Sequence, residues 1–182
     1  MFGFLARRLI AMQERVTGQS AAYMRDIYAG SPAVFWRFAF ASSLYHYSKA
    51  LPPEVYSVAG IAAVRAEDCG PCVQISVNLA LKAGISPGVI RAAATGAVEE
   101  LSDDNRLAYE FAYAVATRNV DAEGLRPEVE RRWGKAGLAE IAFAVANTRS
   151  YPTLKRAMGY AQACRRVTIG GETAIARPRE AA

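Results

Sequence analysis

Apolar positions in this chain recur with the period of an α-helix rather than with the alternation of a β-strand. After Ser102, the residues Leu107, Phe111, Ala114 and Val115 fall at i, i+4, i+7 and i+8 and form one apolar stripe. Ser102 is a favourable helix N-cap, and the two aspartates that follow it suit the positive end of a helix dipole. No long alternation of Val, Ile and Thr of the strand type occurs along the chain. The pattern predicts an all-α fold.

Glycine and proline residues divide the chain into helices. Gly84 ends an apolar stretch and favours a left-handed helix cap, and Ser86-Pro87 then begins a new helix. After Gly170-Gly171 the chain holds Pro178 and few apolar anchors, so we expect residues 171–182 to form an extended or mobile tail. The predicted helices cover residues 5–17, 21–29, 54–66, 71–84, 87–96, 102 onward, 127–134, 138–149 and 152–167, with an aromatic stretch at 35–47.

Composition narrows the class of protein. The chain has 182 residues, which is about one domain, and 36 of them are alanine, a bias that favours closely packed helices. The net charge of +5 comes from 22 basic and 17 acidic residues without a Lys/Arg cluster, so we expect no nucleic-acid partner. Every apolar run is too short to span a bilayer, so we expect no integral membrane association. The three cysteines and the absence of a signal-like N-terminus predict a cytoplasmic protein.

Two further features predict self-association. The helix expected at 138–149 is apolar on most sides, and the stretch at 35–47 is dense in aromatic residues, so the chain has more apolar surface than one small domain can hide. These aromatic side chains could line a pocket, but packing in a core or between subunits is the simpler interpretation. Residues Phe2 to Met12 could form a basic amphipathic helix that touches a membrane, although docking against another subunit is the simpler expectation.

The motif Cys69-Gly-Pro-Cys72 is the clearest candidate for chemistry. Two cysteines three residues apart at a helix start lie within disulfide reach, and the helix N-terminus favours the reactive thiolate. Glu67 and Asp68 oppose that effect and Arg65 supports it, a balance that the sequence leaves open.

Three other interpretations of this cysteine pair stay open. The two cysteines could be an inert part of the core, or they could bind zinc together with Cys164 and His46. A thioredoxin fold shares the tetrapeptide but requires a βαβ pattern around it, which the flanking helical segments lack. A redox dithiol is the leading interpretation, and Cys164 is most simply a small apolar core residue.

The cysteine motif and the helix after it, which ends in Lys82-Ala-Gly-Ile-Ser-Pro87, resemble the carboxymuconolactone decarboxylase/alkylhydroperoxidase (AhpD-like) family. The resemblance extends over about residues 50–170, through Leu101-Ser-Asp and the apolar segment from Leu138 to Asn147. It implies an AhpD-like helical domain at 51–170. Residues 1–50 lie outside the resemblance, and we expect them to form an N-terminal helical extension or a part of the same domain. It also implies assembly into trimers or hexamers. No metal or flavin cofactor is implied.

The resemblance implies thiol-disulfide chemistry as well. In that family scheme Cys72 attacks a hydroperoxide as a thiolate, Cys69 resolves the sulfenic acid to a disulfide, and an external dithiol or redox protein restores the pair. A partner peroxidase is a further expected recipient of electrons. The expected function is therefore a thiol-disulfide oxidoreductase of the alkylhydroperoxidase type.

This chain departs from the family pattern beside the cysteines. The family histidine one turn after the second cysteine is replaced by Ser76, and the preceding helix lacks the family glutamate. A serine hydroxyl can relay a proton but is no general base near neutral pH. Glu67 and the single histidine, His46, are the other candidates for the relay. The alternatives to a redox enzyme are a non-redox decarboxylase-like enzyme or binding protein, and an oligomer in which the disulfide is structural or redox-sensing.

Overall fold

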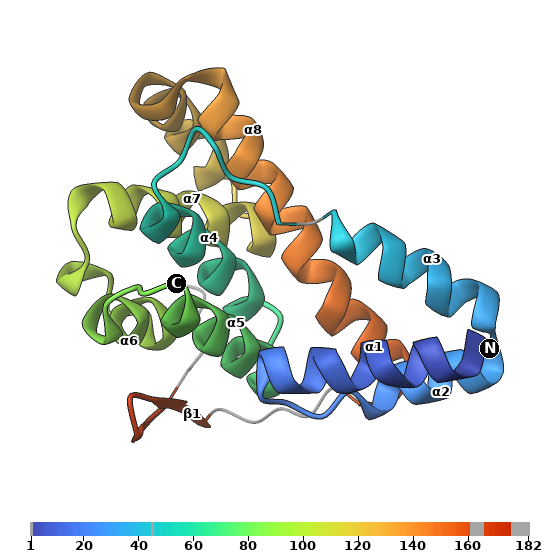
Figure 1. Ribbon diagram of the computed structural model, residues 1–182. Helices are drawn as coiled ribbons and strands as arrows, with labels where there is room; N and C mark the ends of the chain where they lie inside the picture. Colours follow the sequence, from blue (N-terminus) through green and yellow to red (C-terminus); the bar gives the residue numbers. More distant parts are fainter. Residues whose placement is uncertain (1, 45, 161–165, 176–182) are drawn as a thin grey trace.

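The computed structural model describes residues 2–44, 46–160 and 166–175 and has an all-α architecture with one small β-hairpin (Figure 1). In chain order the elements are α1 (Phe2–Thr17), α2 (Ala22–Gly30), α3 (Pro32–Ser43), α4 (Pro53–Arg65), α5 (Gly70–Lys82), α6 (Pro87–Thr95), the 3₁₀ turn η1 (Val98–Glu100), α7 (Asp103–Thr117), α8 (Asp121–Ala157), β1 (Arg166–Ile169) and β2 (Glu172–Ile175). Within these described residues no helix is long and apolar enough to cross a membrane.

The centre of the molecule is α4, which packs against α5, α6, α7 and α8 (Figure 1). Its last turns are buried on nearly all sides, and small residues such as Ala59, Ala62 and Ala63 let the neighbouring helices approach closely. The stripe predicted on α7 is buried against this helix at Leu107 and Phe111. A helix without a solvent face is expected at the middle of a bundle, because only there can every side be covered.

The N-terminal helices build a second apolar cluster. Ala6, Ile10, Tyr23, Met24 and Phe35 are buried together, apart from the main core, and they pack against the C-terminal part of α8. In Figure 1, α1 and α2 lie across the end of α8, and α3 runs beside α8 at a distance. Most of the chain before residue 50 therefore covers one end of the bundle.

The observed course of the long helix α8 differs from the sequence-based prediction at two helix boundaries. Gly134 adopts φ 68° and ψ −178°, so the helix kinks where a break was predicted, but it starts at Asp121, six residues before Pro127. The break expected between residues 149 and 152 is wrong, because the helix continues through Pro152 to Ala157. The ring of Pro152 is buried, and its packing compensates for the backbone hydrogen bond that proline cannot make.

The C-terminal segment also differs from the structure predicted from the sequence. A helix was predicted over residues 152–167, yet Arg166–Ile169 form β1, which pairs antiparallel with β2. The tail predicted from residue 171 is extended at Glu172–Ile175, but it is paired in this hairpin rather than free. Val167 and Ile169 are buried against the core, and the Gln74 side chain donates to Thr168 O (2.9 Å) and accepts from Thr168 N (2.6 Å).

Candidate active site

The cysteine motif lies at the start of α5, where the turn after α4 reverses the chain. Asp68 has a positive φ of 49°, and the next residue, Cys69, is the extended N-cap of α5. The Cys69 carbonyl accepts hydrogen bonds from Cys72 N (2.9 Å) and Val73 N (3.0 Å), and Pro71 occupies the first helical turn. Pro71 has no N–H to leave unpaired there, so the motif is well suited to begin a helix.

The two cysteines are joined by a disulfide bond, with their Cα atoms 5.2 Å apart. Cys69 is 1% exposed and Cys72 is 4% exposed, so the bond lies beneath the molecular surface. The helix N-terminus carries partial positive charge that stabilises a thiolate when the bond is reduced. The predicted redox pair is therefore brought together, in its oxidised form and in an apolar setting.

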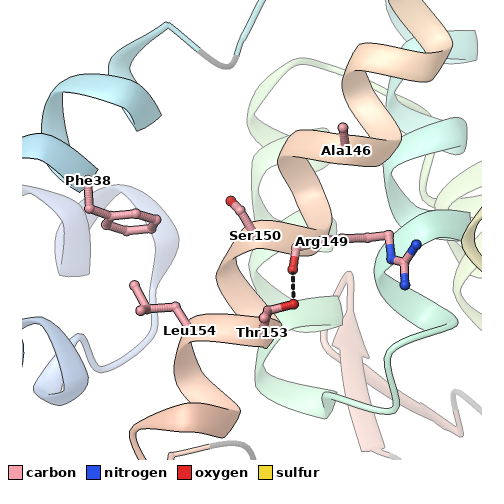
Figure 2. A pocket seen from close by; sticks show the side chains of 6 residues that line it. All are labelled: Phe38, Ala146, Arg149, Ser150, Thr153 and Leu154. Atoms are coloured by element: carbon pink, nitrogen blue, oxygen red, sulfur yellow. Dashed lines mark hydrogen bonds between the residues drawn. The ribbon is translucent and has the colours of Figure 1, made fainter.

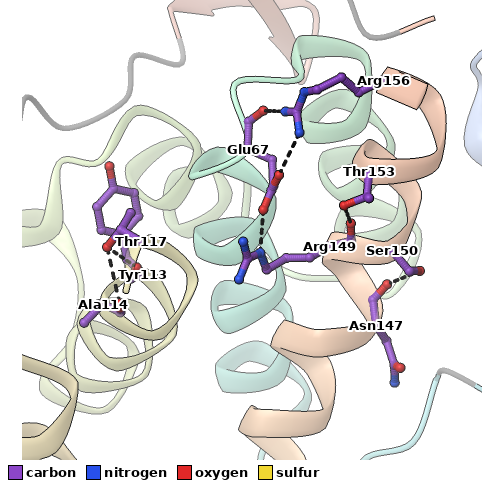
Figure 3. Close-up of polar contacts among 9 residues, drawn as sticks. All are labelled: Glu67, Tyr113, Ala114, Thr117, Asn147, Arg149, Ser150, Thr153 and Arg156. Atoms are coloured by element: carbon purple, nitrogen blue, oxygen red, sulfur yellow. Dashed lines mark hydrogen bonds and ion pairs between the residues drawn. The ribbon is translucent and has the colours of Figure 1, made fainter. Parts of the chain in front are cut away.

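Glu67 connects the cysteine turn to α8 (Figure 3). Its carboxylate pairs with Arg149 Nε and with Arg156 Nη1 (3.3 Å), and Arg156 Nη2 donates to the Glu67 carbonyl oxygen (2.5 Å). The Glu67 side chain is only 9% exposed, and both of these guanidinium groups pair with it. Two cations around one carboxylate offset the negative charge that Glu67 brings to the thiols.

Arg65 provides a further positive charge close in sequence to the motif. It is 4% exposed, and its guanidinium donates to Tyr109 Oη (2.8 Å) and to the Thr95 carbonyl (3.0 Å). The Arg65 Nε is buried without a hydrogen-bond partner in the described part of the chain. Together with Arg149 and Arg156, Arg65 gives three arginines for the two acids of the turn, Glu67 and Asp68.

Ser76 and His46, the other candidates for the proton relay, lie in different parts of the fold. Ser76 is partly buried on α5, one turn beyond Cys72, as its spacing predicted. His46 is exposed in the segment before α4, and its ring meets the Tyr56 ring edge-on with centroids 5.3 Å apart. Tyr56 precedes Arg65 by nine residues, about 14 Å along the helix axis. The structure therefore places His46 at the opposite end of α4 from the cysteines.

The zinc interpretation needs four ligands, of which the structure describes three. Cys164 lies outside the described residues. Among the residues described, no group of three or more His, Cys, Asp or Glu side chains is placed to hold a metal ion. Cys69 and Cys72, two of the four ligands in that interpretation, are instead bonded to each other.

Comparison with known proteins identifies the segment that carries this motif. The model of the carboxymuconolactone decarboxylase family matches residues 32–115, from the start of α3 into α7. Residues 32–115 are therefore similar to the carboxymuconolactone decarboxylase family. The resemblance expected over residues 50–170 is thus confirmed for its first half, and the match begins earlier than expected. No curated protein and no solved structure matched the chain.

A cavity of about 430 Å³ lies between α3 and the C-terminal part of α8 (Figure 2). Its lining residues are Phe38, Ala146, Arg149, Ser150, Thr153 and Leu154. In Figure 2 the Arg149 side chain points away from Phe38, across α8, toward the side on which it meets Glu67. Arg149 therefore lines this cavity and also pairs with Glu67, two residues before Cys69, while Phe38 is the residue of the aromatic stretch that lines the cavity.

Sequence reasoning missed the two arginines of α8. Arg149 and Arg156 are seven residues apart, which is two helical turns and therefore one face of a continuous helix. Because we expected a helix break before Pro152, the sequence-based prediction did not place the two arginines on one helix face. A signal was present, because two cations at that spacing on one helix are suited to hold a single carboxylate.

Proposed function

We propose that this protein, with its carboxymuconolactone decarboxylase-family segment, is a thiol-disulfide oxidoreductase that cycles its Cys69–Cys72 pair between dithiol and disulfide. The observation that carries the proposal is the disulfide between these two cysteines at the N-terminus of α5. A pair held in bonding geometry at a helix start, beside a carboxylate that two arginines neutralise, is suited to reversible oxidation.

The proposed oxidation balances without a metal or an organic cofactor. The Cys72 thiolate attacks the outer oxygen of a hydroperoxide, the O–O bond breaks, and the alkoxide takes a proton and leaves as an alcohol. The Cys69 thiol then attacks the sulfenic sulfur, water leaves, and the disulfide forms. An external dithiol restores the pair by two exchange steps and becomes a disulfide itself.

The surroundings of the pair support disulfide exchange more strongly than peroxide reduction. Peroxide cleavage needs a proton donor for the departing alkoxide. Disulfide exchange releases a thiolate, which is a better leaving group and depends less on a proton donor. Ser76 replaces the family histidine, His46 lies at the far end of α4, and Glu67 is held by two arginines. We therefore propose a dithiol or disulfide-bearing protein as the main partner, with hydroperoxides as slower substrates.

A second candidate function rests on the burial of both cysteines. A disulfide that is 1% and 4% exposed at its two residues can also act structurally, since burial slows attack by an external thiol. In that case the bond stabilises the turn between α4 and α5 and does not turn over.

One experiment separates the two functions. The reduced protein is treated with equimolar hydrogen peroxide or with an oxidised small-molecule dithiol. The remaining free thiols are then alkylated and counted by mass spectrometry. Wild type is run beside Cys69→Ser and Cys72→Ser, with Cys164→Ser as a control that keeps the pair. Fast loss of two thiols in wild type and in Cys164→Ser supports the redox function, and a sulfenic acid trapped only in Cys69→Ser assigns Cys72 as the attacking residue. A pair that exchanges with neither oxidant within minutes supports the structural disulfide.

We also propose that the chain self-associates through α3. This helix carries exposed Val34 and Phe40, and its C-cap Leu44 is exposed as well. Most of its contacts within the described chain are with α2. Exposed apolar side chains gathered on one helix are typical of a subunit interface. Light scattering after size exclusion should show an assembly that Phe40→Ser weakens; an unchanged mass in that variant would contradict the proposal.

A further inference from the structure

The helix α1 has two faces with different environments. Ala6, Ile10 and Thr17 are buried against the rest of the molecule. The opposite side, which we call the outer face of α1, is exposed and consists of Phe4, Leu5, Arg8, Met12, Arg15 and Val16. Figure 1 shows α1 at the periphery of the molecule, beside α2 and the end of α5. A helix with four large apolar residues turned to water requires an explanation beyond the folding of its own chain.

The charged residues on the outer face of α1 are all positive. At 100° per residue its six members fall within a sector of about 120°. The face carries the exposed cations Arg8 and Arg15 and no acid. The acid of this helix, Glu14, lies off the face, where it accepts from Ala21 N (2.9 Å) and pairs with Arg25.

The arginines and the apolar groups are intermixed rather than segregated. The Arg8 guanidinium lies 5.6 Å from the centroid of the Phe4 ring, and Arg15 follows Met12 by one turn. Long arginine side chains can lie along apolar surface and extend their charge outward. The face is therefore suited to a partner that offers anionic groups at its surface and hydrocarbon just below.

We propose that the outer face of α1 binds the surface of a membrane that contains anionic lipids. Phe4, Leu5, Met12 and Val16 enter the boundary between headgroups and acyl chains, and the arginines meet the lipid phosphates. The 16-residue helix is about 24 Å long and lies flat on the bilayer without crossing it. The anchor is separate from the cysteine motif, so it fixes where the protein acts and not what it catalyses.

A second copy of this chain fits the same face less well. In a twofold interface the face meets itself, so Arg8 and Arg15 would oppose the same arginines of the copy. With no carboxylate on the face to pair them, such a contact brings like charges together as water is removed. An anionic lipid surface has no such conflict, since its phosphates supply the missing negative charge.

Vesicle flotation of the full-length protein tests the proposal. We expect binding to vesicles of phosphatidylcholine mixed with phosphatidylglycerol, little binding to phosphatidylcholine alone, and weaker binding as salt rises. The double variant Arg8→Gln/Arg15→Gln should reduce the partition coefficient by about 25-fold, at about fivefold per arginine. Phe4→Ser/Met12→Ser should reduce it as well, because the apolar contribution is lost. The matched control Arg126→Gln/Lys135→Gln removes two exposed charges from α8 and should bind as wild type does.

Each contrary result has a definite meaning. No binding of the wild type to anionic vesicles, or an equal loss of binding in the control variant, overturns the proposal. An assembly in solution that Phe4→Ser/Met12→Ser breaks apart, without lipid binding by the wild type, assigns the face to a second copy instead. Thermal unfolding of every variant verifies that the fold is intact before these results are compared.

Discussion

At the residue scale, Arg65 depends on a glycine that leaves room for its guanidinium group. Gly96 caps α6 with φ 81°, and a Cβ atom at this position would lie 2.7 Å from the Arg65 guanidinium carbon. Gly84 has nearly the same φ of 80°, but a Cβ atom there would meet no other side chain or neighbouring backbone within 4 Å. The two glycines therefore share a backbone requirement and differ in the space around them.

This pair of glycines makes a testable comparison. Gly84→Ala should lower the free energy of unfolding by about 1 kcal/mol, the cost of a left-handed alanine. Gly96→Ala should lower it by roughly 3 kcal/mol, because it also displaces Arg65 from the Tyr109 hydroxyl and the Thr95 carbonyl. Urea denaturation measures both values. Equal losses in the two variants would show that the guanidinium is not confined at Gly96.

Charges beside the cysteines should change thiol reactivity in opposite directions. Glu67→Gln leaves Arg149 and Arg156 without their carboxylate, so the midpoint of the alkylation rate against pH should move down by roughly 0.5–1 unit. Arg156→Gln removes a cation and should move the midpoint up. The measurement is the iodoacetamide rate of the reduced protein. Shifts in the same direction for both variants would point to a structural effect of the turn.

At the element scale, a buried carboxylate fixes the segment that leads into α4. Glu140 of α8 accepts hydrogen bonds from Lys49 N (2.8 Å), Ala50 N (2.9 Å) and Leu51 N (3.1 Å), and from Ser48 Oγ (3.3 Å). Burial raises the pKa of Glu140, but these bonds together outweigh it and hold the pKa below its usual value. The Glu140 charge thus anchors the entry to the central helix.

The effect of Glu140 on stability should depend on pH. A lowered folded-state pKa stabilises the fold above the unfolded value near 4.3, and this stabilisation is lost as pH falls through the folded pKa. Glu140→Gln should therefore cost about 2 kcal/mol at pH 7 and progressively less below pH 4.3. Thermal or urea unfolding across this range measures the difference. Glu128→Gln, on the exposed part of α8, should change little, and a difference from wild type that is independent of pH would contradict the role of the Glu140 charge.

At the scale of the whole molecule, the cysteines are covered by the fold that positions them. The central core, which includes the buried face of the C-terminal hairpin, encloses a disulfide whose residues are 1% and 4% exposed. An oxidant must either be small or await a local opening of the surrounding helices.

This burial predicts a dependence on oxidant size. The reduced protein should react at least about tenfold faster with hydrogen peroxide than with cumene hydroperoxide, since the bulky oxidant requires the opened state. Stopped-flow measurement of thiol loss gives both rates, and a low concentration of urea should raise the slower rate more. A faster reaction with the bulky oxidant would instead indicate an apolar substrate pocket beside the cysteines.

Much of the element pattern was predictable because it depends on local chemistry. The apolar stripe at Leu107 and Phe111, the cap at Ser102 and the left-handed Gly84 each depend on neighbouring residues alone. The errors occurred where packing overrides local preference. The burial of Pro152 lets α8 continue, and the docking of Val167 and Ile169 against the core stabilises a hairpin in place of a helix.

The sequence by itself determined the helical class, the family resemblance and the cysteine pair as the candidate site, because helix periodicity and a four-residue motif are local properties. The tertiary structure alone decided which cations pair with Glu67, two residues before Cys69. Arg149 and Arg156 reach Glu67 across more than 80 residues of chain, and His46 is held at the other end of α4. It also decided which face of α1 is exposed. Such pairings depend on how helices cross, and sequence spacing carries no information about that.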